Sequence, residues 1–388
     1  MLVTYRLTRD IIICVANDLS SVIFICLVGD NPNSWIEMFT IKGVFLAAYL
    51  LYCVDAITMT AEEKLNVRPI VGVLSQEQSK HLQSKFPKEN YTSYIGASYV
   101  KHVEAAGARV VPILIGKSRD YYKDLMKKIN GVFLPGGATF FNQSNGFADA
   151  GQHIYEIAQE MNNEGDYFPI FGTCLGFELL IILASGRGEK ENRVGCFSFR
   201  NLSLNFTSDF RSSKMFKDVP EELVKILADE EVTVNAHQFC IVDENLKSHN
   251  LTKDWRVTSY SKDDNGTSFI ATIENTRYPF YGVQFHPEKS AYEWKASKSY
   301  PHTNNAIRSN RYFLDFFVGE CRKNRHSFAS VEEENKYLIY NYPPVFTGAL
   351  GSAYQQCYFF EPKYHDVTAN GDTNLNPYDT LYYRTDLY

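Results

Sequence analysis

The chain has 388 residues, of which 45% are hydrophobic and 22% are charged. This length and composition suffice for one large core or two modest ones, and they exclude an intrinsically disordered protein. The 39 Lys and Arg residues and 45 Asp and Glu residues give a formal net charge of −6. Because the basic residues also form no long run, the sequence argues against nucleic acid as a partner.

The N-terminal part carries the features of a secretory signal. Residues 41–54 are almost entirely apolar, and Val54 and Ala56 suit positions −3 and −1 of a signal-peptidase site. The apolar run is shorter than a membrane-spanning helix requires. We therefore predict a signal peptide over residues 38–56 and no stable membrane association after its removal; a buried or anchoring helix is the alternative. Residues 1–37 are an upstream extension of doubtful status, to which we assign no function.

Six acceptor sequences for N-glycosylation follow the predicted cleavage site. Their asparagines are Asn90, Asn142, Asn201, Asn205, Asn250 and Asn265. Only enzymes of the secretory pathway glycosylate such sites. Together with the signal peptide, they predict a protein of the endomembrane lumen.

Five cysteines also follow that site, at positions 174, 196, 240, 321 and 357. An odd number leaves at least one thiol free if the others pair internally. The sequence contains no CxxC motif, and His237 with Cys240 lacks further companions. We therefore predict no metal site.

From about residue 68, short apolar segments alternate with helical ones. The predicted strands are 68–74, 109–115, 131–137 and 168–174, and the predicted helices are 97–107, 120–129, 148–164 and 175–186. Nearly continuous apolar strands that alternate with helices indicate a parallel sheet covered on both faces. We predict an α/β three-layer sandwich with a mostly parallel central sheet.

The second half of the chain changes character. Strand-like segments at 233–242, 255–261, 268–276 and 278–288 are separated by turn residues, and a helix is expected over 305–324. This pattern predicts a mixed or antiparallel extension of the same sheet. We place one catalytic domain at 64–361 and a flexible tail at 362–388, since the tail is polar and has no apolar period.

A cysteine at the end of the fourth strand is the strongest chemical signal. Cys174 lies between Gly172 and Gly176, where an apolar strand runs directly into a helix. Glycines on both sides permit the tight turn of a nucleophile elbow, and they favour this interpretation over a cysteine that serves only packing. The helix N-terminus is expected to lower the pKa of the thiol, and the Leu175 N–H is a natural oxyanion donor.

A thiol nucleophile needs a base, and the segment YGVQFHPEK supplies His286. Glu288 lies two residues further on, so in an extended segment it would point to the same side and orient the imidazole. Pro287 disfavours a helix at the histidine. Cysteine, histidine and glutamate would then form a catalytic triad. The glycines in LPGG, Gly136 and Gly137, are candidates for the second oxyanion donor, with a plain turn as the alternative.

The segments LPGGA, FGTCLGFE and YGVQFHPEKSAYEW resemble the γ-glutamyl hydrolases, a branch of the class I glutamine amidotransferase-like superfamily. The resemblance runs from about Arg68 to Glu361 and includes NAHQFC and TGALGSAYQQCYFFE. It implies a flavodoxin-like core and a cysteine-type omega peptidase without a cofactor. It also implies hydrolysis, through a γ-glutamyl thioester, of folate and antifolate poly-γ-glutamates by a homodimer that is lysosomal or secreted. Glu178 and His237 match family residues beside the nucleophile and in the substrate site.

Two other functions on the same fold stay open. An amidotransferase-type glutaminase would feed ammonia to a synthetase, for which the sequence shows no domain. A catalytically silent secreted binding protein would not need Cys174, His286 and Glu288 together.

Overall fold

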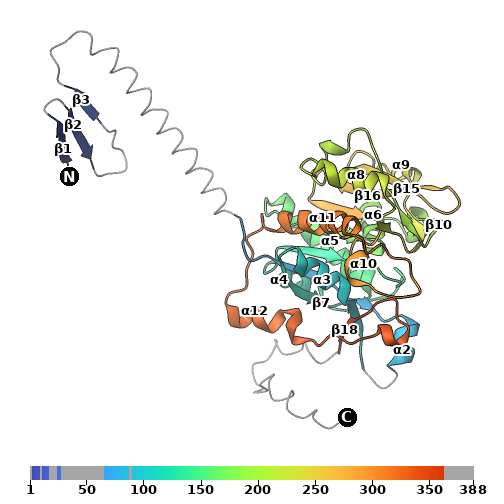
Figure 1. The fold of residues 1–388 in the computed structure, drawn as a ribbon. Coiled ribbons are helices and arrows are strands. Elements are labelled where there is room, and N and C mark those ends of the chain that lie inside the picture. Colours follow the sequence, from blue (N-terminus) through green and yellow to red (C-terminus); the bar gives the residue numbers. More distant parts are fainter. Residues whose placement is uncertain (1, 9–10, 17–23, 28–64, 87–89, 362–388) are drawn as a thin grey trace, which may run out of the picture. The chain divides into compact units, whose positions relative to one another are not determined.

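The computed structural model describes residues 2–8, 11–16, 24–27, 65–86 and 90–361, which fall in two compact units divided after Lys64. In the first unit, strands β1 (Leu2–Thr8), β2 (Ile11–Ala16) and β3 (Phe24–Leu27) form an antiparallel sheet in the order β1-β2-β3 (Figure 1). The predicted signal peptide and the predicted C-terminal tail lie outside the described residues.

The second unit is built on an eight-stranded sheet in the order β12-β15-β16-β17-β9-β8-β4-β7. Its strands are β4 (Ile70–Leu74), β7 (Arg109–Ile113), β8 (Gly131–Leu134), β9 (Ile170–Thr173), β12 (Asn205–Phe206), β15 (Trp255–Lys262), β16 (Ser268–Asn275) and β17 (Phe280–Val283). The five strands from β17 to β7 run parallel, and β12, β15 and β16 extend the sheet in antiparallel fashion. The predicted mostly parallel sheet with a mixed extension is confirmed.

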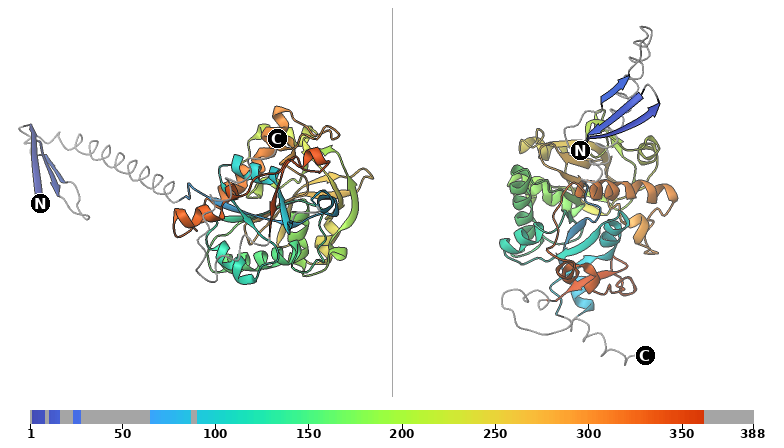
Figure 2. Two further views of the ribbon diagram at one scale, coloured as in Figure 1. Left: turned by 90° about the horizontal axis from the view of Figure 1, so that it is seen from below. Right: turned by 90° about the vertical axis from the view of Figure 1, so that its left-hand side faces the viewer.

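Helices cover both faces of this sheet, as Figure 2 shows. They include α3 (Ala97–Ala105), α8 (Glu221–Asp229) and α11 (Asn304–Cys321) on one side, and α4 (Arg119–Met126), α5 (Phe147–Asn163) and α6 (Leu175–Ser185) on the other. Each face of the sheet packs against its own apolar cluster, because successive side chains of a strand point to opposite faces. In β4, Val71 and Val73 belong to the first apolar cluster, whereas Ile70 and Leu74 belong to the second. The three-layer architecture therefore follows from strands that are apolar on both faces.

A second, three-stranded sheet in the order β18-β6-β5 joins distant parts of the chain. It contains β5 (Gln76–Glu77), β6 (Ser93–Gly96) and β18 (Cys357–Phe360), and none of these strands was predicted from the sequence. The segment 233–242, predicted as one strand, is divided into β13 (Thr233–Val234) and β14 (His237–Cys240). The division lets β13 pair with β11 (Asn201–Leu202) and β14 with β10 (Val194–Ser198).

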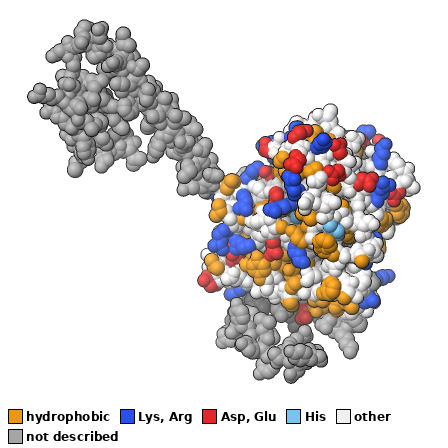
Figure 3. All heavy atoms as spheres, viewed as in Figure 1, with side chains coloured by type: hydrophobic (Ala, Val, Ile, Leu, Met, Phe, Trp, Pro, Cys, Tyr) orange, Lys and Arg blue, Asp and Glu red, His pale blue; other side chains and the backbone are white. Residues whose placement is uncertain are grey.

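The remaining helices are short. They are α2 (Lys80–Lys85), α7 (Glu189–Asn192), α9 (Asp243–Ser248), α10 (Lys289–Tyr292) and α12 (Val331–Tyr337). Among the described residues, no helix combines the length and the apolar character needed to cross a bilayer. Positive and negative side chains are interspersed on the face seen in Figure 3, which presents no continuous basic surface.

One disulfide, Cys196–Cys240, joins β10 to β14. Cys174, Cys321 and Cys357 are free and buried. The prediction of at least one free thiol is thus confirmed.

Candidate active site

Cys174 occupies the tight turn between β9 and α6. Its backbone has φ +50° and ψ −108°, a conformation that a residue with a side chain seldom adopts. The flanking glycines are needed because the backbone approaches itself closely. A Cβ on Gly176 would lie 2.0 Å from the Leu134 carbonyl oxygen, and one on Gly172 would lie 2.6 Å from the Gly176 carbonyl oxygen. The strand, turn and helix of a nucleophile elbow are all present.

The neighbouring parallel strand brings His286 to the same edge of the sheet. Val283 in β17 is paired with Thr173 in β9, so His286 follows its strand end as Cys174 follows β9. The Cys174 N–H donates to the Val283 carbonyl at 2.8 Å, which ties the two strand ends together. The topology, rather than the local sequence, places the two residues near each other.

The His286 Nδ1 atom lies 2.8 Å from Glu288 Oε1, and both side chains are buried. The predicted contact is present, but the extended segment that we invoked for it is wrong. Glu288 has helical backbone angles, φ −71° and ψ −26°, and caps helix α10. Pro287 precedes this cap and takes the second position of the turn in which the Lys289 N–H donates to the His286 carbonyl at 3.3 Å, a position that suits proline, so the chain turns directly after the histidine. That turn folds the carboxylate back onto the imidazole ring.

The glycine loop after β8, which contains Gly136 and Gly137, also borders this site. A Cβ on Gly136 would lie 2.6 Å from His286 Cε1 and 3.2 Å from Cys174 Cβ, so all three residues meet at one point. Gly137 packs instead against the Gln76 side chain. The Leu175 N–H, at the start of α6, lies next to the Cys174 thiol. The structure thus places both predicted sources of oxyanion donors beside the cysteine.

Glu178 is buried one turn along α6 and belongs to a polar chain that reaches the thiol. Its carboxylate accepts from Arg193 Nη1 at 2.7 Å and from Gln284 Nε2 at 3.0 Å. The same Gln284 amide lies 3.9 Å from Cys174 Sγ. Arg193 is held between the rings of Phe141 and Phe239. Glu178 was predicted from the sequence, whereas its two partners were not.

His237 is buried in β14, with Nδ1 3.2 Å from the Cys196 carbonyl oxygen and Nε2 3.2 Å from Asn235 Oδ1. Burial is the main cause that lowers its pKa to about 4, and the proximity of His286 also lowers it. The imidazole is therefore neutral at neutral pH. His237 is close enough to His286 to influence it electrostatically, but neither partner of its ring nitrogens is Cys174, His286 or Glu288.

Burial raises the pKa of the Cys174 thiol, and the Glu178 and Glu288 carboxylates raise it further. The prediction of a lowered thiol pKa is wrong, because the Leu175 N–H and the ammonium of Lys289 oppose these causes only in part. Burial also lowers the pKa of His286, against the opposing effect of Glu288. At neutral pH the resting site therefore contains a thiol and a neutral imidazole that can take its proton.

We expect Glu288→Gln to shift the acid limb of the kcat/KM profile to lower pH. The Glu288 carboxylate raises the pKa of His286, so its neutral replacement lets burial lower that pKa further. The histidine then stays an available base at more acidic pH, while its orientation, and with it kcat, is impaired. Rates measured from acid to neutral pH check this. An acid limb that moves upward, or a loss of kcat larger than that of His286→Asn, would contradict the assigned role.

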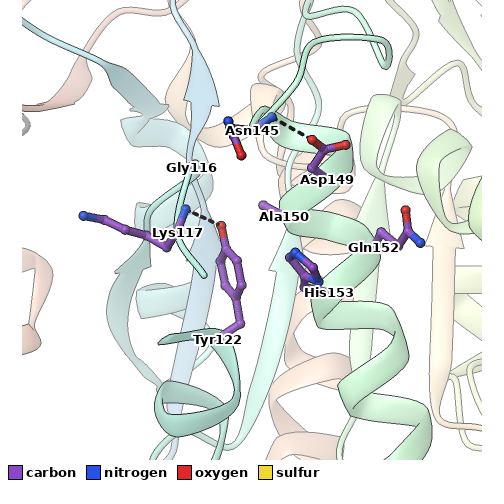
Figure 4. A pocket seen from close by; sticks show the side chains of 8 residues that line it. All are labelled: Gly116, Lys117, Tyr122, Asn145, Asp149, Ala150, Gln152 and His153. Carbon is purple, nitrogen blue, oxygen red and sulfur yellow. Dashed lines mark hydrogen bonds between the residues drawn. The ribbon is translucent and has the colours of Figure 1, made fainter. Parts of the chain in front are cut away.

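A separate hollow of about 260 Å³ is lined by Gly116, Lys117, Tyr122, Asn145, Asp149, Ala150, Gln152 and His153 (Figure 4). The Lys117 N–H donates to the Tyr122 hydroxyl, and the Asn145 N–H donates to Asp149. None of the predicted site residues lines it. Nor does the described part of the chain hold any cluster of three His, Cys, Asp or Glu side chains suited to a metal ion.

Comparisons with known proteins show similarity to one family of hydrolases. The family model described as Peptidase C26 matches residues 69–288. The gamma-glutamyl hydrolase of Homo sapiens is 39% identical over 300 residues, which cover 76% of this chain and 90% of that protein. Gamma-glutamyl hydrolase B of Dictyostelium discoideum is 33% identical over 342 residues, 87% of this chain and 94% of its own.

Solved structures resemble the chain more distantly. A putative GMP synthase component from Thermoplasma acidophilum aligns over 69% of this chain and 98% of its own, with a TM-score of 0.38 and 15% identity. The curated relatives, in contrast, are similar over nearly their whole length. The chain belongs to the γ-glutamyl hydrolases of the Peptidase C26 family.

Proposed function

We propose that this chain hydrolyses the γ-glutamyl peptide bonds of folate and antifolate poly-γ-glutamates, with Cys174 as nucleophile, His286 as general base and Glu288 orienting the histidine. One observation carries the catalytic part. Strands β9 and β17 are adjacent and parallel, and Cys174 follows β9 in a strained turn. The His286–Glu288 pair, with Nδ1 and Oε1 2.8 Å apart, follows β17 at the same edge of the sheet. The choice of folate poly-γ-glutamates as substrate rests on membership of the family. It does not follow from the geometry of the site.

The first half of the reaction forms a thioester. Cys174 Sγ attacks the γ-carbonyl carbon as its proton passes to His286, and the carbonyl oxygen becomes an oxyanion. The N–H groups of Leu175 and of the Gly136–Gly137 segment stabilise that charge. When the tetrahedral intermediate collapses, the C–N bond breaks and His286 returns the proton to the leaving amine.

The second half regenerates the enzyme. His286, again neutral, takes a proton from water as its oxygen attacks the thioester carbonyl. The C–S bond then breaks, and the sulfur leaves with the proton from the imidazolium. The products are a γ-carboxylate and a free thiol. Glu288 accepts a hydrogen bond from Nδ1 throughout, which leaves Nε2 as the atom that carries the moving proton.

Incubation with pteroylpentaglutamate, followed by mass spectrometry of the products, tests the proposal. We expect shortened pteroylglutamates, and the released fragments will show whether cleavage is endo or exo. The matching compound with α-peptide bonds should remain intact. If the purified protein instead released ammonia from glutamine and left the γ-linked substrate whole, the glutaminase function would take its place.

We also propose that the protein enters the secretory pathway and acts in the lysosome or outside the cell. Asn90, Asn142, Asn205, Asn250 and Asn265 are exposed, whereas Asn201 is partly buried and donates to the Ser299 carbonyl at 2.6 Å. The Cys196–Cys240 disulfide suits an oxidising compartment. The family resemblance supports a homodimer, which sedimentation equilibrium would test.

Expression in a secreting eukaryotic cell should therefore yield a protein whose N-terminus lies after Ala56, near Glu62 or a few residues earlier. Its mass should fall on treatment with an N-glycosidase, because the exposed acceptor asparagines carry glycans. N-terminal sequencing and mass spectrometry check both points. An intact Met1 together with an unchanged mass would indicate a protein that stays in the cytosol.

A further inference from the structure

We propose that Gln76 and Tyr354 are positioning residues, which orient the two peptide units flanking Gly136 so that their N–H groups face the oxyanion. This inference rests on the proposed function, since it concerns the stabilisation of charge in that reaction. It assigns a catalytic purpose to the small sheet β18-β6-β5 and to the C-terminal segment that leads into it.

Two buried donors converge on the glycine loop. Gln76 Nε2 lies 3.2 Å from the Pro135 carbonyl oxygen and 3.2 Å from the Gly136 carbonyl oxygen. The Tyr354 hydroxyl donates to the same Gly136 oxygen at 3.3 Å. Gln76 and Tyr354 are 2% and 6% exposed, so water does not compete for these carbonyls.

Holding a carbonyl fixes the amide on the other side of the same peptide. The six atoms of a trans peptide are coplanar, and its C=O and N–H point in opposite directions. The described residues contain no cis peptide bond. Gln76 and Tyr354 therefore hold the Gly136 and Gly137 N–H groups on the side away from themselves. Because Gly136 lies against both Cys174 and His286, an oxyanion formed at the thiol is within reach of that loop.

The loop needs such support because glycine leaves its backbone dihedrals weakly restricted. Larger residues cannot supply the rigidity. A Cβ on Gly136 would lie 2.6 Å from His286, and one on Gly137 would lie 1.7 Å from the Gln76 side-chain oxygen. The site therefore combines two glycines, which allow close approach, with two external hydrogen-bond donors, which restore order.

Both donors belong to one structural unit. Gln76 lies in β5, and Tyr354 precedes β18 by only a few residues. The segment before β18 is itself fixed to the region that follows His286. Lys295 Nζ donates to the Gly351 and Ser352 carbonyls, and the Gln355 N–H donates to Glu293 at 2.7 Å. The chain beyond residue 288, where the family match ends, thus reaches back to the catalytic loop.

The test compares Tyr354→Phe with Tyr358→Phe, a matched control that removes a hydroxyl from β18 itself. The phenylalanine at position 354 keeps the ring that lies under Lys289 and loses the hydroxyl, which bonds to the Gly136 carbonyl and lies 3.5 Å from the Tyr99 hydroxyl. Since complete loss of an oxyanion donor lowers kcat about 10²–10³-fold, we expect misorientation to cost roughly 10-fold in kcat. KM should stay within about twofold, because the ground-state carbonyl gains little from these amides. Gln76→Leu should act in the same direction.

A γ-glutamyl aldehyde supplies the second readout. Its hemithioacetal with Cys174 places an oxygen where the oxyanion forms, so its affinity, measured by thermal shift, should fall by the same factor as kcat. The control should bind it as the wild type does. The inference is overturned if Tyr354→Phe matches Tyr358→Phe in both readouts, or if KM rises as much as kcat falls. Failure of this inference can be distinguished from failure of the proposed function. If the proposed function is wrong, the wild type cleaves no γ-linked substrate, whereas aldehyde binding can be measured without turnover.

Discussion

Cys174→Ala is expected to abolish the hydrolysis of γ-glutamyl bonds while the protein still folds. The substitution removes the sulfur that attacks the carbonyl, and no other free thiol of the described residues lies in the elbow. Alanine keeps the Cβ and the strained backbone, so the packing of β9 against α6 changes little. Product analysis by mass spectrometry gives the activity, and a circular dichroism melt gives the stability.

Cys321→Ala is the matched control. It also removes a buried thiol, but one that lies in α11 against Gly131 rather than in the turn between β9 and α6. This variant should keep its turnover even if its melting temperature falls, because shortening a buried side chain leaves a cavity. Turnover by purified Cys174→Ala would remove the cysteine from the mechanism.

His286→Asn should lower kcat by about 10²–10⁴-fold, the range that general acid–base catalysis contributes. Asparagine can still form a hydrogen bond to Glu288 but cannot accept the thiol proton. The need for a base is acute here, since burial and two carboxylates keep the Cys174 thiol protonated at neutral pH. Single-turnover kinetics would show whether acylation is the step that slows.

His326→Asn provides the comparison, because His326 also pairs with a carboxylate, Asp166, at 2.8 Å. That pair stands beside the Met126 carbonyl rather than beside a thiol, so its loss should leave kcat nearly unchanged. If both histidine variants lost activity equally, the effect of His286 would be structural. If His286→Asn retained most of its kcat, another group would have to serve as the base.

Much of the site was predictable because it depends on local pattern and on sheet topology. The apolar strand that runs into Gly-Thr-Cys-Leu-Gly predicts the elbow, and the parallel sheet predicts that successive strand ends share one edge. Cys174, His286 and the Gly136 loop all lie at that edge. These features needed only the chain's own periodicity and its glycines.

The features that could not be predicted from the sequence depend on contacts between distant residues. The pKa of Cys174 follows from burial and from Glu178 and Glu288, which outweigh the helix N-terminus. Tyr354 reaches Gly136 across 218 positions of sequence, and no local motif marks that contact. The turn at Glu288 was missed because a two-residue offset fits an extended strand and a helix start equally well.

The most direct test of the central claim is inactivation by a γ-glutamyl chloromethyl ketone, followed by peptide mapping. The ketone of the reagent takes the position of the scissile carbonyl, and its chloromethyl carbon lies one bond beyond it. The attacking sulfur displaces chloride from that carbon and remains alkylated as a thioether. We predict that activity falls in step with the labelling of Cys174 alone, that substrate protects against it, and that Cys321 and Cys357 stay free. Labelling of either of those two cysteines in step with inactivation, or full activity with Cys174 alkylated, would contradict the account.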